Sequence, residues 1–229
     1  MELPTLKVER LYRQISNLLI NCIRQGQFSP GAMLPAEREL AKQLGVSRSS
    51  IREALIALEI TGWVEIRTGN GVFIASPLPT AVPARAEDEF SLQDLIKARQ
   101  SFEAMTAELA ARNGSDHQRA ELRELTQDLI QHQLNDEAFL RDDKRFHLLI
   151  SEMSGNDVLR DMMEYLWDKR NSSRFMRLET HYAEGDFAAE MNRDHQQIAQ
   201  AIIGRDAPRA RSCMEQHLQH VYDRLFSAG

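Results

Sequence analysis

Residues 34–60 constrain the fold of this chain more than any other segment, because they have the spacing of two short helices joined by a tight turn. In the first helix Leu40 and Leu44 recur on one face, as the apolar residues of a buried helix do. Gly45 can adopt the left-handed conformation that ends a helix, and Ser47 can cap the next helix by accepting a backbone N–H. The segment therefore predicts a helix-turn-helix.

The second helix of this segment has an apolar stripe that leaves a basic end on the opposite face. Arg48 and Arg52 lie one turn apart at that end, with Ser49 beside them. In a major groove an arginine can donate two hydrogen bonds to guanine, and a short hydroxyl can reach a phosphate or a base edge. On an isolated helix the same arginines could be solvated or paired with Glu53 or Glu59. The helix alone leaves both interpretations open.

Two short alternating runs follow the second helix, at residues 63–67 and 72–74. The Gly- and Asn-rich residues between them predict a β-hairpin. A hairpin directly after a helix-turn-helix is a wing. We expect Arg67 at its base and Gly69 at its tip to approach the DNA backbone or minor groove, the glycine because only a bare backbone comes that close.

Residues 8–75 resemble the winged-helix domain of the GntR family of bacterial transcription regulators, most closely its FadR subfamily. The resemblance rests on the segments LPAEREL, VSRSSIREAL and GWVEIRTGNGVFI. It implies DNA contacts from residues of both helices and of the wing tip, namely Arg38, Ser47, Arg48, Ser49, Arg52, Thr68 and Gly69. We expect a homodimer on a symmetric double-stranded operator, because one winged helix reads too few base pairs for genomic specificity.

Charge is distributed unevenly along the chain, whose net charge is −6. Residues 1–78 hold 9 Lys and Arg against 7 Asp and Glu, a balance of +2, and the remainder hold 19 against 27, a balance of −8. No apolar run approaches the roughly 20 residues that a membrane span requires, and the N-terminus lacks a secretory signal. Cys22 and Cys213 lie in helical apolar patterns and are interpreted as reduced core residues. We expect a cytoplasmic protein.

The chain is expected to divide into a winged helix-turn-helix domain at residues 1–75, a linker at 76–90 and a helical domain at 91–229. The linker segment SPLPTAVPARAEDE has three prolines and no apolar period, so it is expected to be extended. The helices expected beyond it span about residues 91–112, 115–134, 136–153, 157–178, 186–203 and 207–226. The fold class is therefore mainly α, with a small hairpin wing and an all-α bundle of six or seven helices.

Four potential metal ligands lie on three of these later helices. Asp143 and His147 are four residues apart and project from the same face of one helix. His195 and His217 each lie beside an apolar stripe on a later helix. One carboxylate and three imidazoles suit a divalent transition metal in a bundle core. Spacing alone leaves the alternative open, since a lone helical histidine is more often a satisfied or solvated residue than a ligand.

Residues from about 90 to 226 resemble the FCD ligand-binding domain that accompanies FadR-type readers. In that domain an Asp and a His on one helix, with a His on each of two later helices, bind a metal that is often zinc. Asp143, His147, His195 and His217 match this pattern in type and order. The resemblance therefore implies a divalent metal ion, expected to be zinc, with room for a small oxygen ligand.

Three further residues are candidates for binding an effector. Arg99 matches a position where these domains place an arginine towards an effector carboxylate, which a guanidinium holds with two parallel hydrogen bonds. The alternative is an ion pair between Arg99 and Glu103, one turn on. The segment around Arg170 and Asn171 resembles hexuronate-responsive members of the group, which implies contacts with sugar-acid hydroxyls. The alternative is a bundle helix whose charges lie in water.

These patterns predict a metabolite-responsive transcriptional regulator, acting as a repressor, that is controlled by a small carboxylate such as a sugar acid or hydroxy acid. The alternative from another class is a metal-dependent hydrolase or lyase with an accessory DNA-binding module. Hydrolysis would need an open metal position and a separate general base, and the sequence contains no dedicated motif for that base. We therefore do not expect an enzyme. In a third interpretation the metal only stabilises the bundle.

Overall fold

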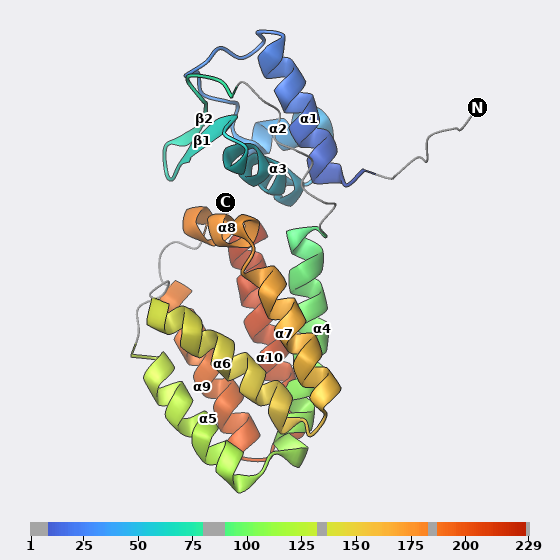
Figure 1. Cartoon of the computed structure of the whole chain (residues 1–229), viewed down its shortest axis with the longest axis vertical. Coiled ribbons are helices and arrows are strands. Elements are labelled where there is room, and N and C mark those ends of the chain that lie inside the picture. The colour runs from blue at the N-terminus through green and yellow to red at the C-terminus, as the bar shows by residue number, and fades with distance from the viewer. Residues whose placement is uncertain (1–8, 80–89, 132–136, 183–186, 228–229) are drawn as a thin grey trace, which may run out of the picture. The chain divides into compact units, whose positions relative to one another are not determined.

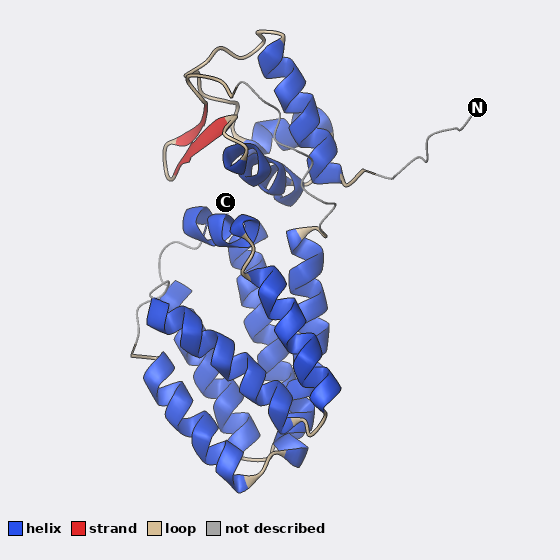
Figure 2. Cartoon of the chain, in the orientation of Figure 1, coloured by secondary structure: helices blue, strands red, loops and turns tan. Residues whose placement is uncertain are grey.

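The computed structural model describes residues 9–79, 90–131, 137–182 and 187–227, which form two compact units. The first unit holds the described residues up to Gln93 together with residues 173–182, and the second holds the rest. Figure 1 follows the chain through its elements, and Figure 2 separates helix from strand. Within these ranges, no helix is long and apolar enough to cross a membrane.

The first unit is a winged helix-turn-helix to which one later helix is added. Its elements are α1 (Leu11–Arg24), α2 (Glu37–Leu44), α3 (Arg48–Ile60), β1 (Val64–Arg67), β2 (Gly71–Ile74) and α8 (Ser173–Tyr182). The strands pair antiparallel, with Val64 opposite Ile74 and Arg67 opposite Gly71. This confirms the predicted helix-turn-helix and its hairpin wing.

The turn between α2 and α3 has the chemistry that its sequence predicts. Gly45 adopts a φ of 65° and ends α2, with its N–H donated to the carbonyl of Ala41. Ser47 Oγ accepts the backbone N–H of Ser50 at 3.1 Å and caps α3. Because α3 packs against both α1 and α2, its apolar stripe is buried and its N-terminal end is fixed in place.

The wing is attached to the body of the first unit at two places. Met33 forms a bridge with Phe73 on β2, and Glu59 Oε1 at the end of α3 accepts the backbone N–H of Ile66 at 3.2 Å. At the tip, Gly69 has a φ of 72°, a conformation that side-chain-bearing residues rarely adopt. The two strands are therefore held by the segment before α2 and by the end of α3 as well as by each other.

The described part of the second unit is all helical. Its elements are α4 (Leu92–Asn113, entering from the first unit), α5 (Asp116–Leu129), α6 (Glu137–Met153), α7 (Asp157–Arg170), α9 (Phe187–Ile203), α10 (Ala207–Tyr222) and a π-helical turn (Asp223–Ser227). α6 packs against α5 and α7, while α9 packs against α5 and α10. Fully buried residues such as Phe146, Ile198 and Met214 form the core between them. The predicted all-α bundle is confirmed.

Two of the expected helices end differently in the structure. The helix predicted over residues 157–178 was wrong as a single element, because α7 ends at Arg170 and α8 begins at Ser173. The intervening Asn171 and Ser172 are residues whose side chains compete with the helical backbone for hydrogen bonds. The last helix changes to a π-helical turn after Tyr222. The predictions that fall on residues 80–89, 132–136 and 186 lie outside the described residues.

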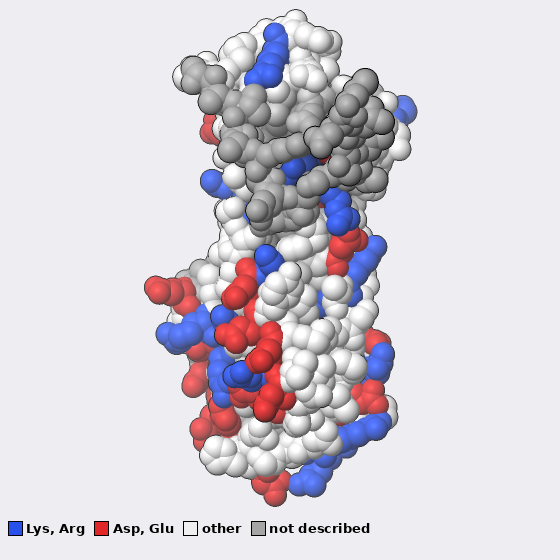
Figure 3. All heavy atoms as spheres, turned by 45° about the vertical axis from the view of Figure 1, so that its right-hand side comes forward, with Lys and Arg blue, Asp and Glu red and all other residues white. Residues whose placement is uncertain are grey.

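Charged side chains of the second unit are mixed in sign on the face that Figure 3 shows. Acidic and basic residues lie side by side there, next to an area that carries neither. Such a face offers no continuous basic surface for a phosphate backbone. Cys22 in the first unit and Cys213 in the second are free and half-buried.

Candidate nucleic-acid interface and metal centre

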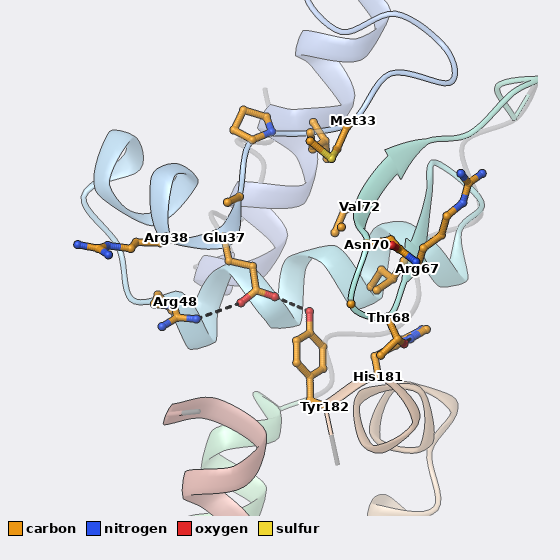
Figure 4. A pocket seen from close by; sticks show the side chains of 16 residues that line it. Met33, Glu37, Arg38, Arg48, Arg67, Thr68, Asn70, Val72, His181 and Tyr182 are labelled. Atoms are coloured by element: carbon orange, nitrogen blue, oxygen red, sulfur yellow. Dashed lines mark hydrogen bonds and ion pairs between the residues drawn. The ribbon is translucent and has the colours of Figure 1, made fainter. Parts of the chain in front are cut away.

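The N-terminal end of α3 and the tip of the wing border one surface pocket of the first unit, with a volume of about 460 Å³. Arg38, Arg48, Thr68 and Gly69 line this pocket, and all four were predicted to contact DNA. Figure 4 shows Arg38 and Arg48 on the helices and Thr68 at the tip of the hairpin. The structure thus brings a basic helix end and a wing tip to the same surface.

The remaining predicted DNA-contact residues do not line the pocket. Ser47 is exposed and caps α3, and its hydroxyl lies 2.9 Å from that of Ser49, which is 8% exposed. Arg52 is only 4% exposed, and its Nε donates to Glu37 Oε2 at 2.9 Å. In this arrangement Arg52 is directed towards the protein rather than towards a base.

Glu37 contacts both arginines at the start of α3, Arg48 and Arg52. Its Oε2 is 3.8 Å from Arg48 Nη2, and its Oε1 accepts a hydrogen bond from the Tyr182 hydroxyl at 2.5 Å (Figure 4). Glu37 was not among the site residues predicted from sequence, and at the start of α2 an acidic residue is already favoured by the helix dipole. Tyr182 and its neighbour His181 were not assigned to the site. No local pattern could have found them, because both approach from a distant part of the chain.

Three imidazoles meet inside the second unit. His147 on α6, His195 on α9 and His217 on α10 are each at most 3% exposed, and one ligand atom of each lies within 4.8 Å of the others. Asp143, one turn before His147, places its Oδ1 3.5 Å from His147 Nε2 and 3.3 Å from His195 Nε2. The four predicted ligands therefore surround one buried site.

The hydrogen bonding and the protonation of these side chains suit a bound metal ion. Both ring nitrogens of His195 are buried, and neither makes a hydrogen bond to the described residues. Buried polar atoms normally have a partner, and a metal ion would supply one. Burial raises the pKa of Asp143, but the neighbouring imidazoles of His147 and His195 lower it well below its usual range. Burial, against the opposing effect of Asp194, lowers the pKa of His217 to about 4. An ionised carboxylate and a neutral imidazole are the forms that bind metals.

Two further carboxylates contact the cluster from outside, and the sequence did not identify either. Glu103 on α4 is 1% exposed and contacts His147 Nδ1, and Asp194 Oδ2 lies 3.4 Å from His217 Nδ1. Burial lowers the pKa of His147, but the carboxylates of Glu103 and Asp143 outweigh it and raise that pKa. Because Glu103 and Asp194 contact the Nδ1 atoms, they leave the Nε2 atoms of both rings for a metal, as outer carboxylates commonly do.

Two of the candidate effector residues lie at the edge of this cluster. The guanidinium groups of Arg99 and Arg170 lie 5.0 and 5.3 Å from the ring of Trp167, and both side chains are buried. Arg99 Nε donates to Glu103 Oε1 at 2.6 Å, which is the ion pair that the sequence left as an alternative. This pair also connects Arg99 to the cluster, because Glu103 contacts His147. Asn171, in contrast, is exposed and ends α7 with its backbone.

Arg170 approaches the cluster more directly than Arg99 does. Its Nη2 lies 3.9 Å from Asp143 Oδ2, whereas the imidazoles of His147 and His195 lie near Oδ1 of the same carboxylate. Two guanidinium groups therefore lie near the cluster: Arg99 pairs with Glu103, and Arg170 lies beside Asp143. Such groups suit an anionic ligand that binds close to a metal.

Comparison with known proteins gives matches along nearly the whole chain. The Uxu operon regulator of Haemophilus influenzae is 35% identical over 225 residues, which cover 96% of this chain and 83% of that protein. The Exu regulon transcriptional regulator of Escherichia coli is 32% identical, over 95% of this chain and 85% of that protein. The family model described as bacterial regulatory proteins, gntR family, matches residues 11–74, and the FCD domain model matches residues 94–220.

This chain belongs to the GntR family and carries an FCD domain. A solved structure of E. coli McbR/YncC is similar to it with a TM-score of 0.52 and 25% identity, over 96% of this chain and 99% of that one. Membership in the GntR family decides between the function classes left open by the sequence. The relatives are transcriptional regulators, so this chain is a DNA-binding transcriptional regulator and not the metal-dependent enzyme that was the alternative.

Proposed function

We propose that this GntR-family regulator is a repressor that binds a symmetric operator as a homodimer and responds to a small carboxylate bound at a zinc site in its FCD domain. The observation that carries the proposal is the buried group of His147, His195 and His217 with Asp143 beside two of the rings. Similarity to regulators named for the Uxu and Exu operons supports a sugar acid as the effector.

In the proposed site Asp143, His147, His195 and His217 hold the ion. If the bound ion accepts more than four ligands, it would have a coordination position left for an oxygen of the effector. Arg170 lies beside Asp143 and can pair with the effector's carboxylate, whereas Arg99 must first release Glu103. Asn171, the residue after Arg170, is exposed and can meet a hydroxyl group of a longer sugar acid.

In the winged helix-turn-helix of the first unit, called the reader below, helix α3 and the wing are proposed to make different DNA contacts. Arg48 and Arg52 are proposed to read guanines in the major groove. The remaining contacts, to phosphates or nearby base edges, come from Arg38, Ser47, Ser49, Thr68 and Gly69. The effector would favour a dimer arrangement whose recognition helices no longer match the half-site spacing. To shift such an equilibrium almost fully, it must prefer one arrangement by roughly 10⁴-fold.

The proposed effector class is tested with metal analysis and thermal unfolding of the full chain. We expect about one zinc ion per purified chain, as at a structural or ligand-binding zinc site. Glucuronate and galacturonate should raise the melting temperature of the metal-loaded chain and leave the chelator-treated chain unchanged. If neither acid stabilises the metal-loaded chain, the sugar-acid assignment is wrong. If chelation melts the domain and no small acid competes for the ion, the metal has only a structural role.

Replacement of Glu103 by Gln is expected to weaken metal binding by about 10- to 100-fold, the usual effect of losing a carboxylate that orients a metal-binding imidazole. The reason is that Glu103 contacts His147 Nδ1 and thereby holds the ring. Competition with a chromogenic chelator measures the affinity. Glu108→Gln is the matched control, because Glu108 lies on the same helix and pairs with Arg112 and Arg211 instead. Equal affinities for the two variants would exclude this role for Glu103.

A further inference from the structure

Helix α8 is fitted to the reader by both apolar and charged contacts. It belongs to the first unit, where it packs against α3. Phe175 and Leu178 on its inner face are fully buried. Arg174 Nη2 lies 3.3 Å from Glu53 Oε2 of α3, and its guanidinium lies 4.2 Å from the ring of Tyr12 on α1. The end of α8 is therefore held at a defined position on the reader.

The last residue of α8 holds an arginine that is proposed to read DNA. The ring of Tyr182 lies 4.5 Å from the guanidinium of Arg52, while the hydroxyl of Tyr182 donates to Glu37, which also accepts from Arg52 Nε. Burial, together with the charge of Glu37, raises the pKa of Tyr182, so the hydroxyl keeps the proton that it donates. Arg52 is enclosed between a carboxylate and an aromatic ring and cannot reach a base edge from there.

The residue before it makes a similar contact with the wing. His181 Nδ1 lies 3.2 Å from Thr68 Oγ1 at the wing tip, and its Nε2 lies 2.8 Å from Glu59 Oε2 at the end of α3. His181 and Tyr182 both line the pocket that Arg38 and Arg48 border (Figure 4). The end of α8 thus occupies the surface on which the phosphates between helix and wing would bind.

We propose that His181 and Tyr182 form a latch on the DNA-reading surface, and that this latch and the DNA duplex compete for Arg52 and the wing tip. The inference rests on the DNA-contact residues proposed above. With the latch closed, Arg52 and Thr68 are bound by the chain itself, and the duplex binds only after the end of α8 has left. The apparent affinity for DNA then equals the affinity of the open form multiplied by the fraction of chains whose latch is open.

The position of the latch in the sequence connects it to the effector site. α8 begins after Asn171 and Ser172, which directly follow α7, and α7 carries Trp167 and Arg170 at the histidine cluster. A ligand that draws Arg170 away from Asp143 acts on the helix that leads into α8. The latch is therefore a place where effector binding can change the exposure of Arg52.

Tyr182→Ala in the full chain tests the latch. The probe is a fluorescent duplex that the wild-type chain selects from a random library, and anisotropy measures its affinity. We expect Tyr182→Ala to bind about tenfold more tightly than wild type, which corresponds to about 1.4 kcal/mol. Tyr182→Phe keeps the ring over Arg52 and loses the hydrogen bond to Glu37, so its increase should be smaller. The matched control is Thr180→Ala, because Thr180 is exposed and its hydroxyl bonds to Met176 within α8.

Unchanged or weaker binding by Tyr182→Ala and Tyr182→Phe, with melting curves that show both to be folded, would overturn the latch. Weaker binding would mean that the end of α8 belongs to the DNA contact surface. Arg48→Ala in the same assay shows whether an error lies in the latch or in the assignment of the DNA-reading residues. If Arg48→Ala loses binding and the Tyr182 variants match wild type, only the latch is wrong. If Arg48→Ala binds like wild type, the reader itself is misassigned.

Discussion

Arg48→Ala is expected to weaken operator binding strongly while leaving effector binding intact. Arg48 is the first residue of α3, its side chain is 32% exposed, and it borders the pocket between helix and wing. A bidentate contact between arginine and guanine contributes about 1–3 kcal/mol. A homodimer loses that contact twice, so the affinity should fall by a factor of roughly 30 to 10⁴. Arg52→Ala should act in the same direction, with an added loss of stability because Arg52 is buried.

Anisotropy with the selected duplex measures this loss, and the thermal shift produced by the effector shows whether the FCD domain still works. Arg24→Ala is the matched control, since Arg24 is an exposed arginine at the end of α1 that does not line the pocket. Loss of both DNA and effector binding by Arg48→Ala would indicate a folding defect. Wild-type affinity for DNA would mean that α3 is not the recognition helix.

The features of the fold that the sequence predicted depend on residues close together in the chain. Gly45 and Ser47 set the turn before α3 through contacts that span at most four residues. The same holds for the capping box at the start of α5, where Ser115 and Gln118 bond to each other's backbone. Apolar spacing then identified which face of each helix is buried. Local chemistry was sufficient to predict the fold class and the element order, except for the break between α7 and α8.

The contacts that surround the candidate sites could not be predicted in this way. Glu37 lies 15 residues from Arg52 and 145 residues from Tyr182, to both of which it is bonded. No periodic pattern relates residues at such separations, because the packing of whole helices brings them together. The break after Arg170 was missed as well, although the segment DKRNSSR at residues 168–174 contains no apolar residue to continue the helical pattern. α8 could therefore not be assigned to the reader from sequence.

His195→Ala is expected to remove the metal and, with it, the stabilisation that metal and effector give to the FCD domain. Among the proposed ligands His195 is distinguished by having both buried ring nitrogens without a hydrogen bond to the described residues. Its removal costs the contact between its Nε2 and Asp143 Oδ1 at 3.3 Å, and the main loss is that of a ligand. A metal present at about 1,000 times its dissociation constant stabilises the folded state by about 4.1 kcal/mol. This contribution should be absent from the variant.

Thermal unfolding with and without chelator measures that contribution, and metal analysis shows whether the ion is bound. The matched control is His220→Ala, because His220 is half-buried near the cluster and contacts Asp194 at 2.9 Å without belonging to the ligand group. We expect the control to keep its metal and its response to chelator. If His195→Ala binds zinc as wild type does, the metal assignment is wrong. If it loses zinc and glucuronate still stabilises it, effector binding does not depend on the ion, and the proposal that the metal binds the effector is wrong.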